Sequence, residues 1–150
     1  MKIILSILLL LLVGQEGHPG QSSSSVIETE KVKGIICQSN KEWEFMFKGK
    51  QFWTPTKEQV LKAEEELERF LKEKPPARSP ELARKLGRYK RQYVGILVDG
   101  QKRIFANFYC TEEPLGCRPV VYEDGGDCFF EVEYDVKDGK ITRLEINGEA

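Results

Sequence analysis

The cysteines are the residues whose chemistry can be argued most directly from the sequence. The 150-residue chain has four of them, Cys37, Cys110, Cys117 and Cys128. No two are separated by two residues, which disfavours a thioredoxin-like redox site or a zinc knuckle. An even number of cysteines in an exported chain predicts two disulfides, for which three pairings exist. We favour Cys110–Cys128 with Cys37–Cys117, because Cys110 ends one expected strand and Cys128 begins another. The competing pairing is Cys110–Cys117 with Cys37–Cys128.

Acidic side chains near the C-terminus are the next candidates for chemistry. A carboxylate pair for glycoside hydrolysis could come from four residues, Glu131, Glu133, Asp135 and Glu145. They lie on an expected solvent-facing strand surface, and no feature marks any of them as desolvated. The loop from Glu123 to Asp127 could hold calcium, but it lacks the ligand spacing of a known calcium loop, so a hairpin turn is favoured.

The only histidine, His18, lies outside the expected folded part. This position removes Ser-His and Cys-His nucleophilic schemes, and histidine-based metal sites, from that part. We therefore predict no catalytic residue, no cofactor-binding residue and no metal ligand, and a protein that is not an enzyme.

Two further groups of side chains could contact a partner. The densest basic run is Arg84, Lys85, Arg88, Lys90 and Arg91. It could bind an anionic group, but cations at the end of a short helix starting at Ser79-Pro80 are the favoured interpretation. Four aromatic residues could line a ligand groove, although aromatic residues in strands more often belong to the core: Trp43, Trp53, Tyr122 and Phe129.

The charge balance favours neither nucleic acid nor an acidic membrane as a partner. The formal net charge is −1, which gives no indication of nucleic acid or of an acidic membrane. The partner is an unknown protein or small ligand, and the oligomeric state is left open.

The chain divides into three parts. Residues 1–14 resemble a secretory signal, with Lys2 before an apolar run from Ile3 to Val13 that is too short to span a bilayer. Residues 15–31 are rich in Gly, Ser and polar residues and are expected to be a flexible tether. Residues 32–150 form a single domain. We expect a secreted, periplasmic or extracellular protein without stable membrane insertion after cleavage.

The C-terminal part, residues 89–150, predicts antiparallel strands separated by Gly-containing turns. Residues 128–136 alternate between an apolar and a mostly acidic face, as in a half-buried strand. Residue parity in the following hairpin pairs Tyr134 with Thr142 and Val132 with Leu144, around a left-handed Gly139.

The hairpin around Asp99-Gly100 leaves its loop length open, because both faces of its strands are apolar. We favour the even register, which groups residues 94 and 96 with residues 104 and 106. Shorter strands are expected at residues 32–37, 42–47 and 120–122.

One amphipathic helix is expected after residue 54. Either Thr54 caps it, with Pro55 at its first position, or Thr56 does, with Gln59 completing a capping box. The apolar stripe recurs at helical spacing in Val60, Ala63, Leu67, Phe70 and Leu71. The expected fold class is α+β, with one long amphipathic helix packed on a curved antiparallel sheet of about four to five strands.

This order of a strand, a helix and four antiparallel strands, with four cysteines in an exported chain, resembles the secreted cystatins. The resemblance covers residues 32–148 and implies a cystatin-like roll. The nearest match to the Gln-x-Val-x-Gly inhibitory loop of that family is Gln92-Tyr93-Val94-Gly95, which is one residue short, and Pro119 is followed by Val120 where the family has Trp. Cysteine-protease inhibition by a non-standard loop is therefore an alternative function.

A second resemblance is to uncharacterised small exported proteins. It rests on four short motifs: Thr54-Pro55-Thr56, Arg91-Gln92-Tyr93-Val94-Gly95, Asp124-Gly125-Gly126 and Asn147-Gly148-Glu149-Ala150. This resemblance implies the same roll but does not indicate any function. The leading hypothesis is a small secreted, non-enzymatic binding domain. A further alternative is an enzyme of the related cone-shaped roll, similar to the nuclear-transport-factor-two-like isomerases and dehydratases.

Overall fold

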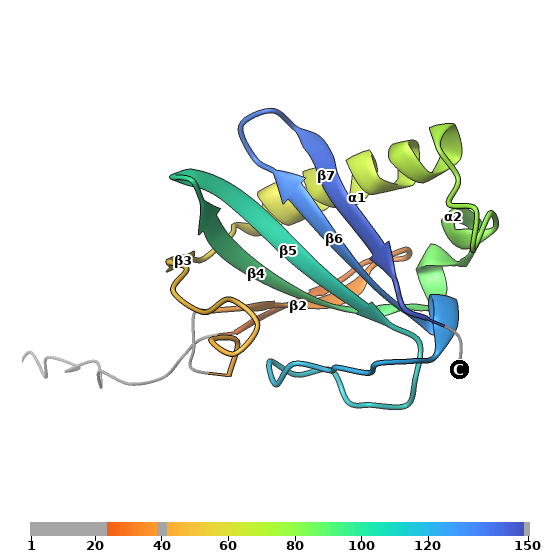
Figure 1. Ribbon diagram of the computed structural model, residues 1–150, viewed down its shortest axis with the longest axis horizontal. Helices are drawn as coiled ribbons and strands as arrows, with labels where there is room; N and C mark the ends of the chain where they lie inside the picture. Colours follow the sequence, from red (N-terminus) through yellow and green to blue (C-terminus); the bar gives the residue numbers. More distant parts are fainter. Residues whose placement is uncertain (1–23, 39–41, 149–150) are drawn as a thin grey trace, which may run out of the picture.

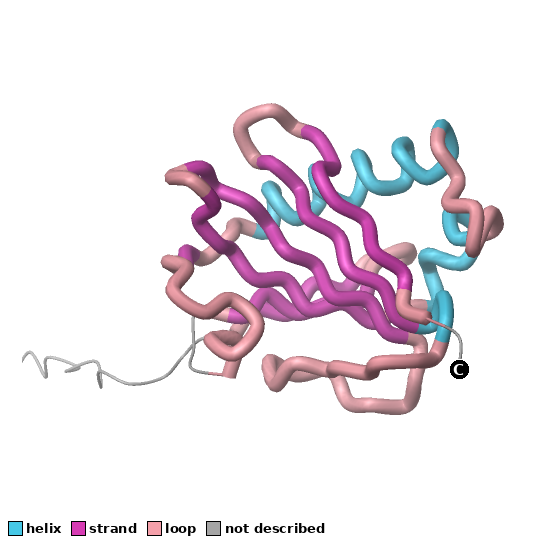
Figure 2. Tube along the Cα trace, in the orientation of Figure 1, coloured by secondary structure: helices cyan, strands magenta, loops and turns pink. Residues whose placement is uncertain are grey.

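One mixed β-sheet forms the centre of the protein (Figures 1 and 2). The computed structural model describes residues 24–38 and 42–148. The strands are β1 Ser25–Glu28, β2 Lys33–Cys37, β3 Phe52–Trp53, β4 Lys90–Val98, β5 Gln101–Tyr109, β6 Phe129–Asp135 and β7 Lys140–Ile146. The helical elements are α1 Lys57–Glu73, α2 Leu82–Lys85 and two single 3₁₀ turns, η1 Leu86–Arg88 and η2 Gly126–Cys128.

The topology shows that the expected fold class is wrong. The seven strands follow the order β1-β2-β4-β5-β6-β7, with β3 paired to β4. Because β2 runs parallel to β4, the sheet is mixed, and it is larger than the antiparallel sheet of four to five strands that we expected for a cystatin-like roll. Among the described residues the sheet dominates, and the α-helices are only α1 and the four-residue α2.

The N-terminal hairpin is the physical reason for this difference. Strand β1 pairs antiparallel with β2, from Ser25 opposite Ile36 to Glu28 opposite Lys33. It falls within residues 15–31, so the part predicted as tether is too long at its C-terminal end. Ile27 is buried in the core and gives this short strand its anchor. The predicted leader and the first part of the predicted tether, residues 1–23, lie outside the described residues.

Helix α1 begins with a capping box. Of the two expected caps, Thr56 is the one present: its hydroxyl accepts from the Gln59 amide, and the Gln59 side chain accepts from the Thr56 amide. Four of its buried residues are apolar, Val60, Ala63, Leu67 and Leu71, and the fifth is Glu64. The Lys74 amide bonds to the Phe70 carbonyl at its end, one residue before Pro75.

The two faces of the sheet carry separate apolar clusters. The face toward α1, called the inner face here, holds the larger cluster, with Phe108, Phe130 and Tyr93 at less than 2% exposure. The opposite, outer face holds a smaller cluster around Trp43, Val94 and Phe105. Irregular chain rather than a helix covers this outer cluster (Figure 1).

The β4–β5 hairpin has the register that we did not favour. Val94 lies opposite Phe105 and Gly95 opposite Ile104, so the loop is the two residues Asp99 and Gly100. Both have positive φ, 50° and 76°. A two-residue loop of this kind matches the twist of the strands. The geometry of the turn therefore sets the register, which the apolar pattern of the two strands left open.

The β6–β7 hairpin agrees in part with the expected register. Val132 lies opposite Leu144, as predicted, and Gly139 is left-handed with φ 63°. Tyr134, however, lies opposite Ile141 and not Thr142, because a bulge shifts the register after Glu133.

Two expected strands are absent from the described chain. Residues 42–47 form turns, with the amides of Met46 and Phe47 both bonded to the Trp43 carbonyl, which buries the Trp43 ring against Phe105. Residues 120–122 do not pair as a strand, because the carbonyl and the amide of Val120 form hydrogen bonds with the side chains of Asn107 and Gln92.

Candidate functional site

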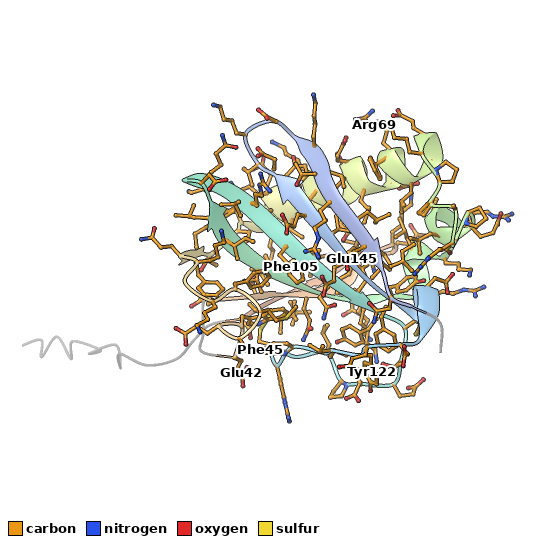
Figure 3. All side chains as sticks on the ribbon, in the orientation of Figure 1. Glu42, Phe45, Arg69, Phe105, Tyr122 and Glu145 are labelled. Atoms are coloured by element: carbon orange, nitrogen blue, oxygen red, sulfur yellow. A yellow bond between two sulfur atoms is a disulfide. The ribbon has the colours of Figure 1, made fainter. Side chains whose placement is uncertain are left out.

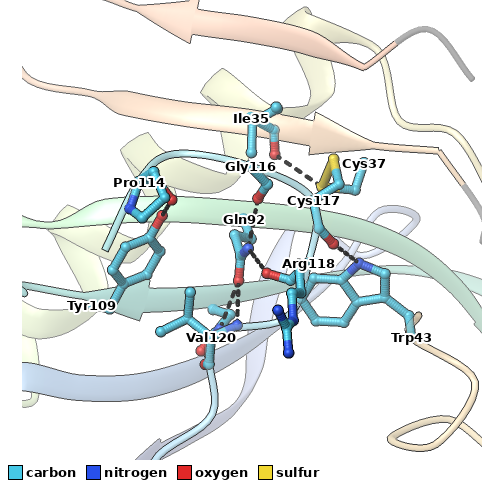
Figure 4. Close-up of a disulfide and its surroundings, with 11 residues drawn as sticks. Ile35, Cys37, Trp43, Gln92, Tyr109, Pro114, Gly116, Cys117, Arg118 and Val120 are labelled. Atoms are coloured by element: carbon cyan, nitrogen blue, oxygen red, sulfur yellow. Dashed lines mark hydrogen bonds between the residues drawn. A yellow bond between two sulfur atoms is a disulfide. The ribbon is translucent and has the colours of Figure 1, made fainter. Parts of the chain in front are cut away.

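A long irregular segment, residues 111–123, crosses the outer face between β5 and η2. We call it the strap. Two disulfides fix it: Cys110–Cys128 joins the segments that flank the strap. Cys37–Cys117, shown in Figure 4, ties its middle to β2. This pairing is the one favoured from the sequence. The amide of Cys110 also bonds to the Cys128 carbonyl, so the two ends are held by backbone and side chain together.

Two buried amides connect the strap to the sheet. Gln92 on β4 donates to the carbonyls of Gly116 and Arg118, both at 2.6 Å, and accepts from the Val120 amide at 3.1 Å. Asn107 on β5 donates to the Gln92 side chain at 3.0 Å and to the Val120 carbonyl at 2.8 Å. The strap thus obtains from side chains the hydrogen bonds that a strand obtains from a neighbour. Gln92 lies at the centre of this network in Figure 4.

Three more side chains bond to strap carbonyls. The Trp43 indole donates to Cys117 at 2.9 Å, and the Tyr109 hydroxyl donates to Pro114 at 3.2 Å. Lys90 donates to Thr111 at 3.1 Å and to Glu113 at 2.7 Å. The strap is therefore held along its length, although it has no regular secondary structure.

The strap presents apolar side chains to solvent. Val121 is 53% exposed and Tyr122 is 44% exposed. The Tyr122 ring stacks on Phe129 at 4.3 Å, and its hydroxyl donates to Glu113 at 3.0 Å, so this exposed ring has a fixed place. Phe45, on the neighbouring turn segment, is 66% exposed, and it lies with Tyr122 along the lower margin of the molecule in Figure 3.

A hollow lies beside these residues on the strap. Its volume is about 400 Å³, and Pro114, Pro119, Val121 and Tyr122 contribute to its wall together with Arg118. A fixed tyrosine ring with an arginine beside a hollow has the composition of surfaces that contact another protein.

The carboxylates considered for glycoside hydrolysis lie on the outer face, in ion pairs. Glu133 accepts from Arg103 at 3.2 Å and from Arg143 at 3.4 Å, and Arg143 also pairs with Glu145. Asp135 accepts from the amides of Lys137 and Asp138 and shapes the β6–β7 turn. Burial raises the pKa of Glu131. These contacts hold the β5–β7 surface together and leave no open carboxylate pair facing a cavity.

The acidic loop at residues 123–127 connects the strap to the inner-face segments. Asp127 accepts from the Ser79 hydroxyl at 2.5 Å and from Lys85 at 2.6 Å, and these bonds lower its pKa. Its carbonyl accepts from the Tyr89 hydroxyl at 2.5 Å. Burial, with the Asp127 charge second, raises the pKa of Tyr89 to about 12. Within residues 24–38 and 42–148, no three His, Cys, Asp or Glu side chains gather as they would around a metal ion. His18 lies outside these ranges.

The basic run does not form one patch. Lys85 pairs with Asp127, Arg84 pairs with Glu81, and Lys90 bonds to the strap. Arg91 is 1% exposed and points to the inner face, where it pairs with Glu64 at 3.2 Å. The period-two alternation of β4 places Lys90 and Arg91 on opposite faces of the sheet, and Arg84 and Lys85 lie before it on α2.

The four candidate aromatic residues are also separated. Trp43 is fully buried under the strap, and Trp53 packs against the inner-face cluster with its indole donating to the Ile96 carbonyl at 3.1 Å. Only the strap brings two of them together, where Tyr122 stacks on the buried Phe129.

Sequence reasoning missed the buried polar residues on both faces. Glu64 falls at the helical spacing of the apolar stripe, four residues after Val60, and that position was a usable signal. Gln92 precedes the apolar run of β4 that begins at Tyr93, which was a weaker signal. Tyr93, whose hydroxyl donates to Glu64 at 2.7 Å, has its pKa raised well above the ordinary value by burial and then by the Glu64 charge.

Comparison with known proteins gives no relative: no family model matches the chain, and neither the curated proteins nor the solved structures contain a significant match. Among the helices of the described residues, none has the length and apolar character needed to cross a membrane.

Proposed function

We propose that this protein is an exported, non-enzymatic recognition domain that contacts a partner protein through the strap. The observation that supports this most is the way the strap is held. Residues 111–123 have no regular structure, yet two disulfides and the buried Gln92 and Asn107 amides fix them in one conformation.

A fixed irregular loop favours binding for an energetic reason. Ordering a loop upon association costs conformational entropy, and a loop already ordered by its own fold avoids that cost. Recognition residues are commonly placed on loops carried by a rigid sheet. The exposed Tyr122 ring and the neighbouring Arg118 belong to the types that carry binding energy at protein interfaces, and the exposed Val121 adds apolar area beside them.

Export is supported by the disulfides and by the N-terminal sequence. Disulfides persist in oxidising compartments, and all four cysteines are paired. The apolar run from Ile3 to Val13 behind Lys2 has the composition of a secretory leader.

Site-specific photo-crosslinking in the producing cell tests the proposal. A benzophenone amino acid replaces Val121 on the strap, and in a matched control it replaces Lys137, an exposed residue of the β6–β7 turn. We expect an adduct of discrete mass from position 121 that position 137 does not give, and its loss when Tyr122→Ser is added. Equal adducts from both positions, or none from position 121, would contradict the proposal.

A further inference from the structure

A second hollow lies on the inner side of the molecule, away from the strap. It is bounded by the β1–β2 turn, by the middle of α1 and by the α2–η1 segment, which are three elements far apart in the sequence. Its volume is about 550 Å³, within the range of small-molecule sites in proteins. Apolar side chains form much of its wall: Val32, Leu61, Ala83 and Leu86.

A buried carboxylate lies at the base of this groove. Glu64 is only 9% exposed, and its Oε1 accepts from the Tyr93 hydroxyl at 2.7 Å and from Arg91 Nε at 3.2 Å. In the part of the chain that the structure describes, no group donates to its Oε2. This oxygen is not fully enclosed by the protein. Glu64 lines the groove, so Oε2 is an acceptor that is reached from it.

The cation beside Glu64 is committed to the protein backbone. Arg91 donates to the carbonyls of Tyr89 at 2.6 Å, Leu86 at 2.9 Å and Lys31 at 3.4 Å. Its guanidinium is planar and rigid, so these bonds fix its orientation. The donors of Arg91 are therefore directed at the protein, and an anionic ligand would find few of them in the groove.

The remaining charge around the groove is negative. Lys31 and Arg84 also line the groove, but Lys31 pairs with Glu68 of the same wall and Arg84 pairs with Glu81, which lies outside it. The exposed carboxylates of Glu30 and Glu65 line the groove and form no ion pair with any described residue. The lining holds four carboxylates against three cations, and all three cations are already paired, so the groove favours a cation over an anion.

We propose that this groove binds a small organic cation, a primary ammonium attached to a compact apolar body. The ammonium donates to Glu64 Oε2, and the apolar body packs on Val32, Leu61, Ala83 and Leu86. A charge-assisted bond in a partly enclosed site gives the ammonium its advantage over a neutral donor. The site is on the opposite face of the sheet from the strap and does not depend on the function proposed for it.

Three probes that share one apolar body test this assignment. Cyclohexylmethylamine, cyclohexylmethanol and cyclohexanecarboxylate are titrated at pH 7 into the isotope-labelled protein, and amide shifts are followed by NMR. We expect the amine to bind about tenfold more tightly than the alcohol, with shifts confined to the groove, and the carboxylate to bind more weakly than either. Equal binding of amine and alcohol, tighter binding of the carboxylate, or no groove shifts with the amine would each overturn the proposal.

Variants separate the charge from the shape of the site. Glu64→Gln keeps an acceptor but removes the charge, so it should abolish the preference for the amine over the alcohol. Because this variant unpairs Arg91 and could fail to fold, Ala83→Leu provides a second test: it fills the groove without a change of charge and should abolish binding of the amine. The control is Glu73→Gln, at an exposed residue of α1 that lies outside the groove, and it should bind the amine as the wild type does. Unchanged binding by Ala83→Leu would overturn the proposal.

Discussion

The two faces of the sheet are covered in different ways. On the inner face, α1 buries apolar side chains and the Glu64–Arg91 pair against the strands. On the outer face, the strap contributes few apolar contacts and is held by disulfides, amide side chains and an indole hydrogen bond. The inner covering is the kind that supplies folding free energy through burial, which grows with the apolar area removed from water.

This difference indicates separate roles for the two coverings. A covering held by directional bonds keeps one conformation while its apolar side chains stay exposed, as Val121 and Tyr122 do. A covering held by burial must direct its apolar side chains inward and keep them from a partner. Removal of inner-face bonds should therefore lower global stability, whereas removal of outer-face bonds should release the strap and leave the sheet folded.

The largest effect is expected from Arg91→Met on the inner face. This substitution leaves the Glu64 charge buried without its partner and should lower the free energy of unfolding by about 3–5 kcal/mol. Denaturant unfolding followed by fluorescence measures the loss. In the control, Glu64→Leu is added so that no charge remains unpaired, and the double variant should recover part of the loss. A loss below about 1 kcal/mol in Arg91→Met would contradict the structural role of the pair.

Removal of the Cys37–Cys117 disulfide is the next test, on the outer face. The paired substitution Cys37→Ser with Cys117→Ser should cost about 2–4 kcal/mol, because the bridge closes a loop with a sequence separation of 80 residues. Native-state hydrogen exchange should show a larger loss of protection in the strap than in β4–β6, where the loss should not exceed the change in global stability. An equal loss of protection in the strap and the sheet would show that the strap belongs to the same folding unit as the core.

The parts of the fold that follow from local patterns were predictable from the sequence. The Thr56 capping box, the left-handed Gly139 and the pairing of Val132 with Leu144 each depend on residues close in the chain. The disulfide pairing followed from strand ends that meet across neighbouring strands. Such features depend on short-range geometry, which residue types report directly.

The parts that depend on long-range pairing were not predictable in the same way. The parallel pairing of β2 with β4 joins residues 33–37 to residues 90–94, and no local pattern encodes it. The strap has the composition of an ordinary loop, and its order comes from Gln92, Asn107 and Trp43, which lie elsewhere in the chain. Glu64 and its partner Arg91 are 27 residues apart, so no local pattern shows that they pair.

A smaller effect on the outer face is expected from Gln92→Leu. The change leaves the carbonyls of Gly116 and Arg118 and the Val120 amide without their partner, which should cost about 2 kcal/mol and loosen the strap. Thermal unfolding gives the stability, and hydrogen exchange of residues 116–122 gives the local effect. Gln101→Leu, at an exposed glutamine of β5, is the matched control and should change neither. Unaltered hydrogen exchange in the strap of Gln92→Leu would show that the Gln92 side chain does not order the strap.

The smallest effect is expected at Asp127, where the acidic loop after the strap meets the segment that follows α1. Its bonds from Lys85 and Ser79 lower its pKa, so its stabilisation is complete above the ordinary aspartate pKa near 4 and is lost as the pH falls below it. Asp127→Asn should therefore lose about 1 kcal/mol at pH 7 and much less at about pH 3, as measured by urea unfolding at both values. Asp138→Asn, at an exposed aspartate of the β6–β7 turn, serves as the control and should show no such dependence. A loss in Asp127→Asn that is equal at both pH values would assign the effect to hydrogen-bond geometry, and the charge of Asp127 would then have no part in joining the two regions.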